Sequence, residues 1–154
     1  MAASPRTSPT TAPAADTTVR CPGCGSVLAP LAGDGPVPAG ASAACARLYE
    51  ETVRGLREDA AGDPRAAALV ALADGAYAAQ HPAGTAPEQP SDALDALAAR
   101  LGEPAGGDRW RVTSPTIWRT TIADVAADLD VIDLSVLVEA WARAVLADWS
   151  PDGS

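Results

Sequence analysis

The fold depends first on residues 63–82, which read DPRAAALVALADGAYAAQHP. Asp63 followed by a proline is typical of a helix start, because aspartate caps the free N–H groups and proline fits the first helical position. From Ala66 to Gln80 the stretch is apolar nearly all round, with Asp74 as its one charge, and a helix without a polar face is usually buried. The helix must end near His81, because Pro82 disfavours helical geometry in the residue before it. This stretch therefore predicts a central, buried helix.

Three further helices are expected around the central one. Ser42 is a suitable N-cap for the helix that precedes it. Ser91 and Gly102 are placed to begin and end a short helix that follows it. The last helix is expected from about Leu134 to Trp149. Each segment carries apolar residues at helical spacing, so each has one face for the core.

The chain between the third and last helices has a different composition. Residues 110–125 are rich in β-branched side chains, which favour an extended chain, although Pro115 prevents one continuous strand. The acidic run 124–133 is expected to be a solvated loop. The sequence therefore predicts a mainly α fold. We expect a small helical domain of about four helices, with a C-x2-C segment near the N-terminus and a short extended segment before the last helix.

The composition limits the kinds of protein that the chain can be. It has 154 residues, 36 of them alanine, and a net charge of −9 with no lysine. Nucleic-acid binding needs clustered basic residues, and a membrane span needs about 18 or more consecutive apolar residues. Neither pattern occurs, so we expect no nucleic-acid or membrane partner. Because each buried alanine contributes little transfer free energy, the core is expected to be thin, and a bound metal would supply stability that it lacks.

Residues 1–19 form an Ala/Pro/Ser/Thr segment with almost no bulky apolar side chain. Such a segment cannot bury enough surface to offset its loss of conformational entropy, so we expect a disordered tail. The segment also lacks the apolar stretch of an export signal. We therefore expect a cytoplasmic protein with a single helical domain over residues 20–151. In that compartment closely spaced cysteines more often bind metal than form disulfides.

Cys21 and Cys24 form the C-x2-C pair of the segment CPGCG. A redox-active pair usually begins a helix, whose dipole lowers the pKa of the first thiol, whereas Gly25 and Pro30 disfavour a helix here. A proline and a glycine between the thiols suit a tight knuckle whose N–H groups point at both sulfur atoms. We favour a metal site, with a redox pair and ordinary free thiols as the alternatives.

A tetrahedral zinc site needs four ligands, and the chain contains two further good ones, Cys45 and His81. Taken singly, Cys45 is better explained as a core residue on an apolar helical face. His81 alone is better explained as a helix C-terminal residue that contacts the last carbonyl groups. Together with the C-x2-C pair they make four. We therefore predict a Zn²⁺ site formed by Cys21, Cys24, Cys45 and His81.

Other side chains near these helices have open roles. Asp74, Asp92 and Asp95 are alternative ligands that would make the site harder and more open. Tyr77 is expected to be a wall residue one turn before His81, with a hydrogen-bonding role as its alternative. The tryptophans are expected to pack in the core or at its boundary: Trp110, Trp118, Trp141 and Trp149.

Three motifs resemble a family of small actinobacterial proteins of unknown function, DUF5946. They are CPGCG, the Ser-x-x-Cys-x-x-Leu-Tyr-Glu segment that starts at Ser42, and the Ala-Tyr-Ala-x-Gln-His-Pro segment that ends at Pro82. The resemblance covers roughly residues 20–151. It implies one shared metal site at the three cysteines and the histidine, and it assigns no activity. The family carries a further His and an Asp in the central helix and a His in the next helix. At those three places this sequence has Val70, Gly75 and Asp95. Any chemistry that the family's side chains carry out there is lost or changed in this chain.

The sequence favours a zinc-binding helical protein without catalysis, an accessory or interaction protein with a closed structural site. One alternative is a metal-dependent enzyme acting on a small organic substrate, with three protein ligands, a bound water and a base such as Asp74 or Asp95. Another is a thiol redox or metal sensor, which needs a solvent-reachable cysteine of low pKa. The partner is expected to be a protein or a small molecule.

Overall fold

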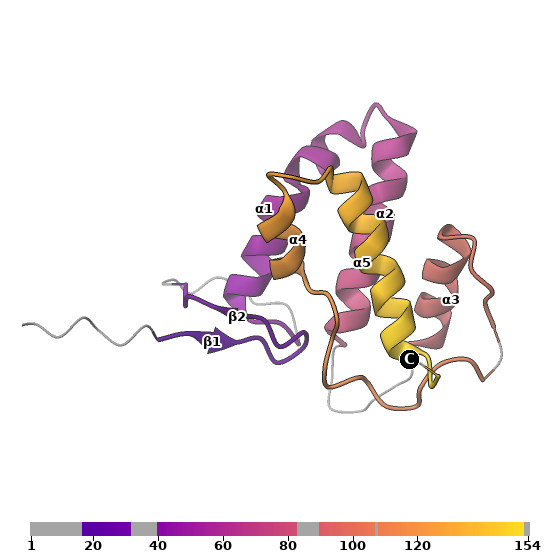
Figure 1. Ribbon diagram of the computed structural model, residues 1–154. Coiled ribbons are helices and arrows are strands. Elements are labelled where there is room, and N and C mark those ends of the chain that lie inside the picture. The colour runs from indigo at the N-terminus through magenta and orange to yellow at the C-terminus, as the bar shows by residue number, and fades with distance from the viewer. Residues whose placement is uncertain (1–16, 32–39, 83–89, 107, 153–154) are drawn as a thin grey trace, which may run out of the picture.

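The structure, a computed structural model, describes residues 17–31, 40–82, 90–106 and 108–152. Its elements, in chain order, are β1 (Val19–Arg20), β2 (Val27–Leu28), α1 (Ala43–Asp59), α2 (Pro64–Gln80), α3 (Ser91–Arg100), α4 (Ile122–Asp128) and α5 (Leu134–Trp149). Figure 1 shows the helices as one group with the small β-hairpin at one side. The mainly α prediction is confirmed. None of the helices in the described part of the chain is both long enough and apolar enough to cross a membrane.

The helices α1 and α2 form an antiparallel hairpin. Each has 17 residues, and residues 60–63 connect them. The predicted N-caps of these two helices are present: Ser42 Oγ accepts from the Cys45 N–H at 3.2 Å, and Asp63 Oδ1 accepts from the Arg65 N–H at 2.9 Å. The prediction that Ser91 caps the next helix is wrong, because Ser91 is the first residue of α3 and Pro90 is at the cap position without a side-chain hydrogen bond. Because the helices are equally long and the turn is short, the first turn of α1 lies at the same end of the hairpin as the last turn of α2 (Figure 1).

The helix α2 has the central position that the sequence predicts, since α1, α3 and α5 all pack against it. Ala73 and Ala76 are fully buried there. A Cβ on Gly75 would lie 3.1 Å from a methyl group of Leu97, so the small residue allows α3 to approach closely. The first turns of α2 are largely exposed, and Ala78 near its end is exposed as well, so α2 is central but it is not buried on every side.

Tryptophans supply the bulk that the alanine-rich helices lack. All four are buried, as predicted, and two fix the end of α2 through their indole N–H groups. Trp149 donates to the Ala79 carbonyl at 3.1 Å, and Trp141 donates to Gln80 Oε1 at 3.1 Å. The Gln80 amide donates in turn to the Thr120 carbonyl at 2.7 Å. The last turn of α2 is therefore held by α5 and by the chain before α4.

The segment before α5 differs from the sequence prediction. Residues 108–121 form neither helix nor strand, but Ile122 begins α4. The extended prediction is therefore wrong for residues 122–125, the acidic run 124–133 is only partly a loop, and the described residues contain five helices rather than four. The reason is local, because the N–H and hydroxyl of Thr121 donate to Asp124 Oδ2 at 2.8 and 3.0 Å. These bonds fix the first turn of α4.

The capping carboxylate of α4 gives a test of this account. We expect Asp124→Ala to lower the free energy of unfolding by about 1 kcal/mol, because the Thr121 N–H loses its acceptor at the helix start. Asp128→Ala, at the other end of α4, removes an exposed carboxylate from an unfavourable place on the helix dipole and should be neutral or slightly stabilising. Urea denaturation followed by circular dichroism measures both. Equal effects of the two substitutions would contradict the capping role.

Candidate metal centre

The CPGCG segment forms a tight knuckle between β1 and β2. These strands pair antiparallel, Val19 with Leu28 and Arg20 with Val27. Within the turn, the Cys21 N–H donates to the Ser26 carbonyl at 2.8 Å, and the Gly25 N–H donates to the Cys21 carbonyl at 3.0 Å. Gly25 has φ of +77°, a conformation that favours glycine. No helix begins at Cys24, which agrees with the sequence argument against a thioredoxin-type pair.

The knuckle packs directly on the last turn of α2. A Cβ on Gly23 would lie 2.5 Å from the Gly40 carbonyl oxygen and 2.5 Å from His81 Cδ2, so only glycine allows this approach. The Gly23 carbonyl also accepts a hydrogen bond at 3.0 Å from the Trp118 indole. The knuckle is therefore clamped between the end of α2 and the chain that leads into α4.

The four residues predicted as ligands come together in one buried cluster. Their Sγ atoms and imidazole nitrogen all lie within 4.8 Å of one another. Cys24 Sγ lies 3.7 Å from Cys45 Sγ, and Cys45 Sγ lies 3.5 Å from His81 Nε2. The exposed fractions are 1% for Cys21, 4% for Cys24, 0% for Cys45 and 6% for His81. The α1–α2 hairpin explains why Cys45 and His81 lie close together, because Cys45 is in the first turn of α1 and His81 follows the last turn of α2.

The carboxylates considered as alternative ligands have other environments. Asp74 accepts hydrogen bonds from Tyr49 and from Arg57. Asp95 accepts from the Trp110 indole at 2.8 Å and from the Gly106 N–H at 2.9 Å. Asp92 is exposed on α3. Among the described residues, the group that could hold a metal contains the three cysteines and the histidine and no carboxylate.

Each sulfur atom of the cluster has a hydrogen-bonding neighbour. The Ser42 N–H donates to Cys21 Sγ at 3.4 Å, Ser26 Oγ lies 3.1 Å from Cys24 Sγ, and the Tyr77 hydroxyl donates to Cys45 Sγ at 3.7 Å. Of the two roles considered for Tyr77, hydrogen bonding is therefore present. Ser26 was not among the residues that the sequence singled out. Its place two residues after the second cysteine of a tight turn was the available signal.

The orientation of the imidazole is also fixed. His81 Nδ1 lies 2.7 Å from the Tyr77 carbonyl oxygen, so Nδ1 carries the proton and donates it to this acceptor. That leaves Nε2, the atom nearest Cys45, as the nitrogen with a free lone pair. A histidine that binds metal usually donates its other ring N–H in this way.

Hydrogen bonds and burial shift the pKa values of the cluster residues in different directions. A hydrogen bond from Cys45 lowers the pKa of Cys24 to about 3, although burial opposes this. The same contact, with burial, raises the pKa of Cys45 far above that of a free thiol. Burial works against the charged form of His81, but its hydrogen bonds to Cys24 and to the Tyr77 carbonyl raise its pKa overall. The contacts within the cluster thus favour the charged form of Cys24 and disfavour that of Cys45.

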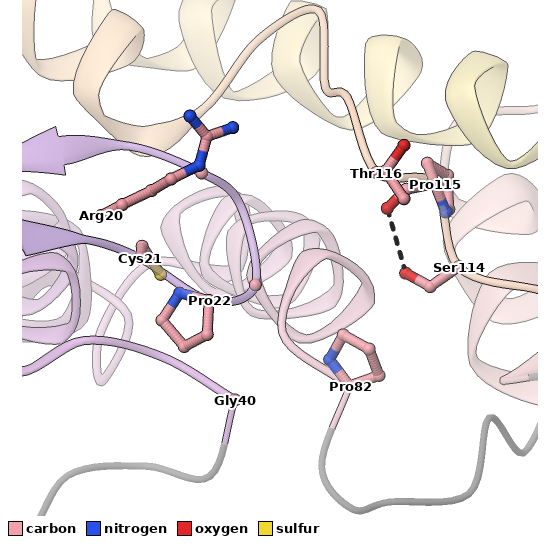
Figure 2. A pocket seen from close by; sticks show the side chains of 10 residues that line it. Arg20, Cys21, Pro22, Gly40, Pro82, Ser114, Pro115 and Thr116 are labelled. Atoms are coloured by element: carbon pink, nitrogen blue, oxygen red, sulfur yellow. Dashed lines mark hydrogen bonds between the residues drawn. The ribbon is translucent and has the colours of Figure 1, made fainter.

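A surface cleft of about 400 Å³ lies beside the knuckle. Figure 2 shows Arg20 and Cys21 on the knuckle side and Ser114 and Thr116 across from them. Arg20 is the one charged side chain among the described residues that line it. The cleft therefore brings solvent close to Cys21, but its described lining residues include neither a carboxylate nor an imidazole.

Residues 19–114 match the model of a family of unknown function, DUF5946. The chain belongs to this family. No curated protein and no solved structure matches it. The DUF5946 match includes the hairpin, all four residues of the cluster and the helices α1 to α3, whereas α4 and α5 follow it in the chain. The resemblance to this family, which supported the ligand prediction, is thus confirmed as a family membership.

The close packing of the knuckle on α2 can be tested with two glycines. We expect Gly23→Ala to lower the free energy of unfolding by about 1–3 kcal/mol, because the added methyl group collides with backbone and with the His81 ring. Gly55→Ala is the control. Gly55 is in α1 with open space around it, so alanine there should stabilise by about 0.5–1 kcal/mol. Thermal unfolding of both variants measures this, and a neutral Gly23→Ala would contradict the observed contact.

Proposed function

We propose that the protein binds one Zn²⁺ ion through Cys21, Cys24, Cys45 and His81, and that the ion is structural. The spacing of the donor atoms carries this proposal. Tetrahedral zinc with bonds of about 2.3 Å to sulfur and about 2.0–2.1 Å to nitrogen sets sulfur atoms about 3.8 Å apart, and sulfur and nitrogen about 3.6 Å apart. The Cys24–Cys45 and Cys45–His81 distances are 3.7 and 3.5 Å. These two edges already have the length that zinc requires.

The chemistry of the donors supports zinc over harder cations. Thiolate and imidazole ligands suit zinc, whereas Mg²⁺ and Ca²⁺ prefer oxygen. The cluster already contains one sulfur of low pKa, Cys24. Zinc binding would release the proton held by Cys45, as metal binding does at other thiol sites.

The position of the site supports a structural role. The cluster joins the β1–β2 hairpin, the start of α1 and the end of α2, so one ion would tie three parts of the chain together. Four protein ligands fill a tetrahedron and leave no place for a substrate or a water molecule. In a domain whose helices are faced largely with alanine, such an ion would replace apolar burial as a source of stability.

The alternative of a metal-dependent enzyme has one observation in its favour, the cleft beside Cys21. An enzyme would need one of the four ligands to leave the metal and a base close to the bound water. The described residues that line the cleft include no carboxylate, and Asp74 and Asp95 are engaged elsewhere. We therefore favour an accessory or interaction protein, with a protein or a small molecule as its partner.

The state of the thiols supports a proposal about the compartment. All three cysteines are free, and two sulfur atoms 3.7 Å apart would be open to oxidation outside a reducing environment. We propose a cytoplasmic location. The net charge of −9 supports a protein without nucleic-acid or membrane partners.

Metal content and its removal test the proposal. We expect about one zinc per chain, measured by elemental analysis of the purified protein. A chelator titration should remove the ion and reduce the helical circular dichroism signal, since the ion joins the ends of α1 and α2. Protein that is purified without metal and has full helicity would contradict the structural role.

Single ligand substitutions locate the ion. We expect Cys45→Ala and His81→Ala each to weaken zinc binding by about 100-fold or more, because each removes one of four bonds. Asp92→Ala, which removes an exposed carboxylate on α3, is the control and should bind zinc as the unmodified protein does. Competition with a colorimetric chelator measures the affinities. An unchanged affinity in either ligand variant would remove that residue from the site.

A further inference from the structure

Tyr77 contacts two of the four proposed ligands. Its hydroxyl donates to Cys45 Sγ at 3.7 Å. Its ring stacks on the His81 imidazole, with the ring centroids 4.0 Å apart and the planes inclined by 29°. Its carbonyl oxygen also accepts from His81 Nδ1 at 2.7 Å. One residue of α2 therefore constrains both a sulfur and a nitrogen of the cluster.

The ring of Tyr77 is held on its other face by Tyr49. Their centroids lie 4.1 Å apart with the planes 13° from parallel. The Tyr49 hydroxyl donates to Asp74, and Arg57 donates to the same carboxylate at 2.7 Å. A continuous column of groups thus runs from His81 through two phenol rings to an ion pair at the surface. The stacked Tyr49 ring leaves Tyr77 little freedom to turn away from the cluster, and this contact depends on the ring and not on the Tyr49 hydroxyl.

We propose that Tyr77 is a positioning residue of the metal site, holding the Cys45 thiolate with its hydroxyl and the His81 ring with its stack and its carbonyl group. The inference rests on the zinc site proposed above. A hydroxyl that donates to a metal-bound thiolate stabilises its negative charge, and loss of such an outer partner typically costs about 10–100-fold in metal affinity.

Of the three hydrogen bonds to sulfur, the one from Tyr77 to Cys45 reaches the most buried cysteine. Cys45 is 0% exposed, so water cannot replace a missing donor at its sulfur. Cys21 and Cys24, by contrast, lie in the walls of surface hollows and take their hydrogen bonds from the Ser42 N–H and the Ser26 hydroxyl. Tyr77 therefore supplies a donor at the most buried of the three cysteines, which are 0%, 1% and 4% exposed for Cys45, Cys21 and Cys24.

Two matched variants separate the hydroxyl from the packing. Tyr77→Phe keeps the ring in the stack and removes the hydroxyl that bonds sulfur. Tyr49→Phe keeps the neighbouring ring and removes the hydroxyl that bonds Asp74. Both proteins are loaded with Co²⁺, which takes zinc's place and gives a sulfur-to-cobalt charge-transfer band. Zinc loss from the Zn²⁺-loaded proteins is then followed with a colorimetric chelator in excess.

We expect the charge-transfer band of Tyr77→Phe to move to longer wavelength, because the thiolate loses a donor and gives up an electron more easily. Zinc loss should be about tenfold faster. Tyr49→Phe should match the unmodified protein in both measurements. A purely structural Tyr77 would leave the band in place, because the phenyl ring is retained.

The inference is overturned by an unmoved band and an unchanged zinc loss in Tyr77→Phe, or by an equal change in Tyr49→Phe. In either case the unmodified protein still binds zinc, and the proposed function stands. If the unmodified protein binds neither zinc nor cobalt, the proposed function fails and the role of Tyr77 fails with it.

Discussion

The structure depends on the burial of three thiols and one imidazole at a single point. Burying a polar group costs free energy unless another group replaces its bonds to water, and here the four groups contact one another as well as the residues around them. Cys24 Sγ lies 3.7 Å from Cys45 Sγ, and Cys45 Sγ lies 3.5 Å from His81 Nε2. A cation accepted by all four would turn this arrangement into the strongest connection between the β1–β2 hairpin, the start of α1 and the end of α2.

The rest of the molecule holds the two ends of this connection in place. Trp141 and Trp149 bond the last residues of α2, and Trp118 bonds the knuckle. These tryptophans belong to the part of the chain that follows the match to DUF5946. The common part of the family therefore contains the donors, and the C-terminal part of this chain supplies the aromatic packing that surrounds them.

Much of this architecture could be predicted from the sequence. The caps at Ser42 and Asp63 define two equal helices, and an antiparallel pair of equal helices brings Cys45 next to His81. The helix α4 was missed because its β-branched residues suggest a strand, although Thr121 and Asp124 have the spacing of a helix cap. The contacts of Tyr77 with Cys45 and Tyr49 depend on how two helices face each other, which spacing along one helix does not determine. Val19, assigned by sequence to the tail, begins β1.

X-ray absorption at the zinc edge of the purified protein tests the central claim most directly. It reports which atoms bind the metal and how far away they lie. The account predicts three sulfur atoms at about 2.3 Å and one nitrogen at about 2.0–2.1 Å, with no water oxygen. A spectrum with fewer than three sulfur atoms, or with an oxygen from water among the ligands, would contradict the closed structural site.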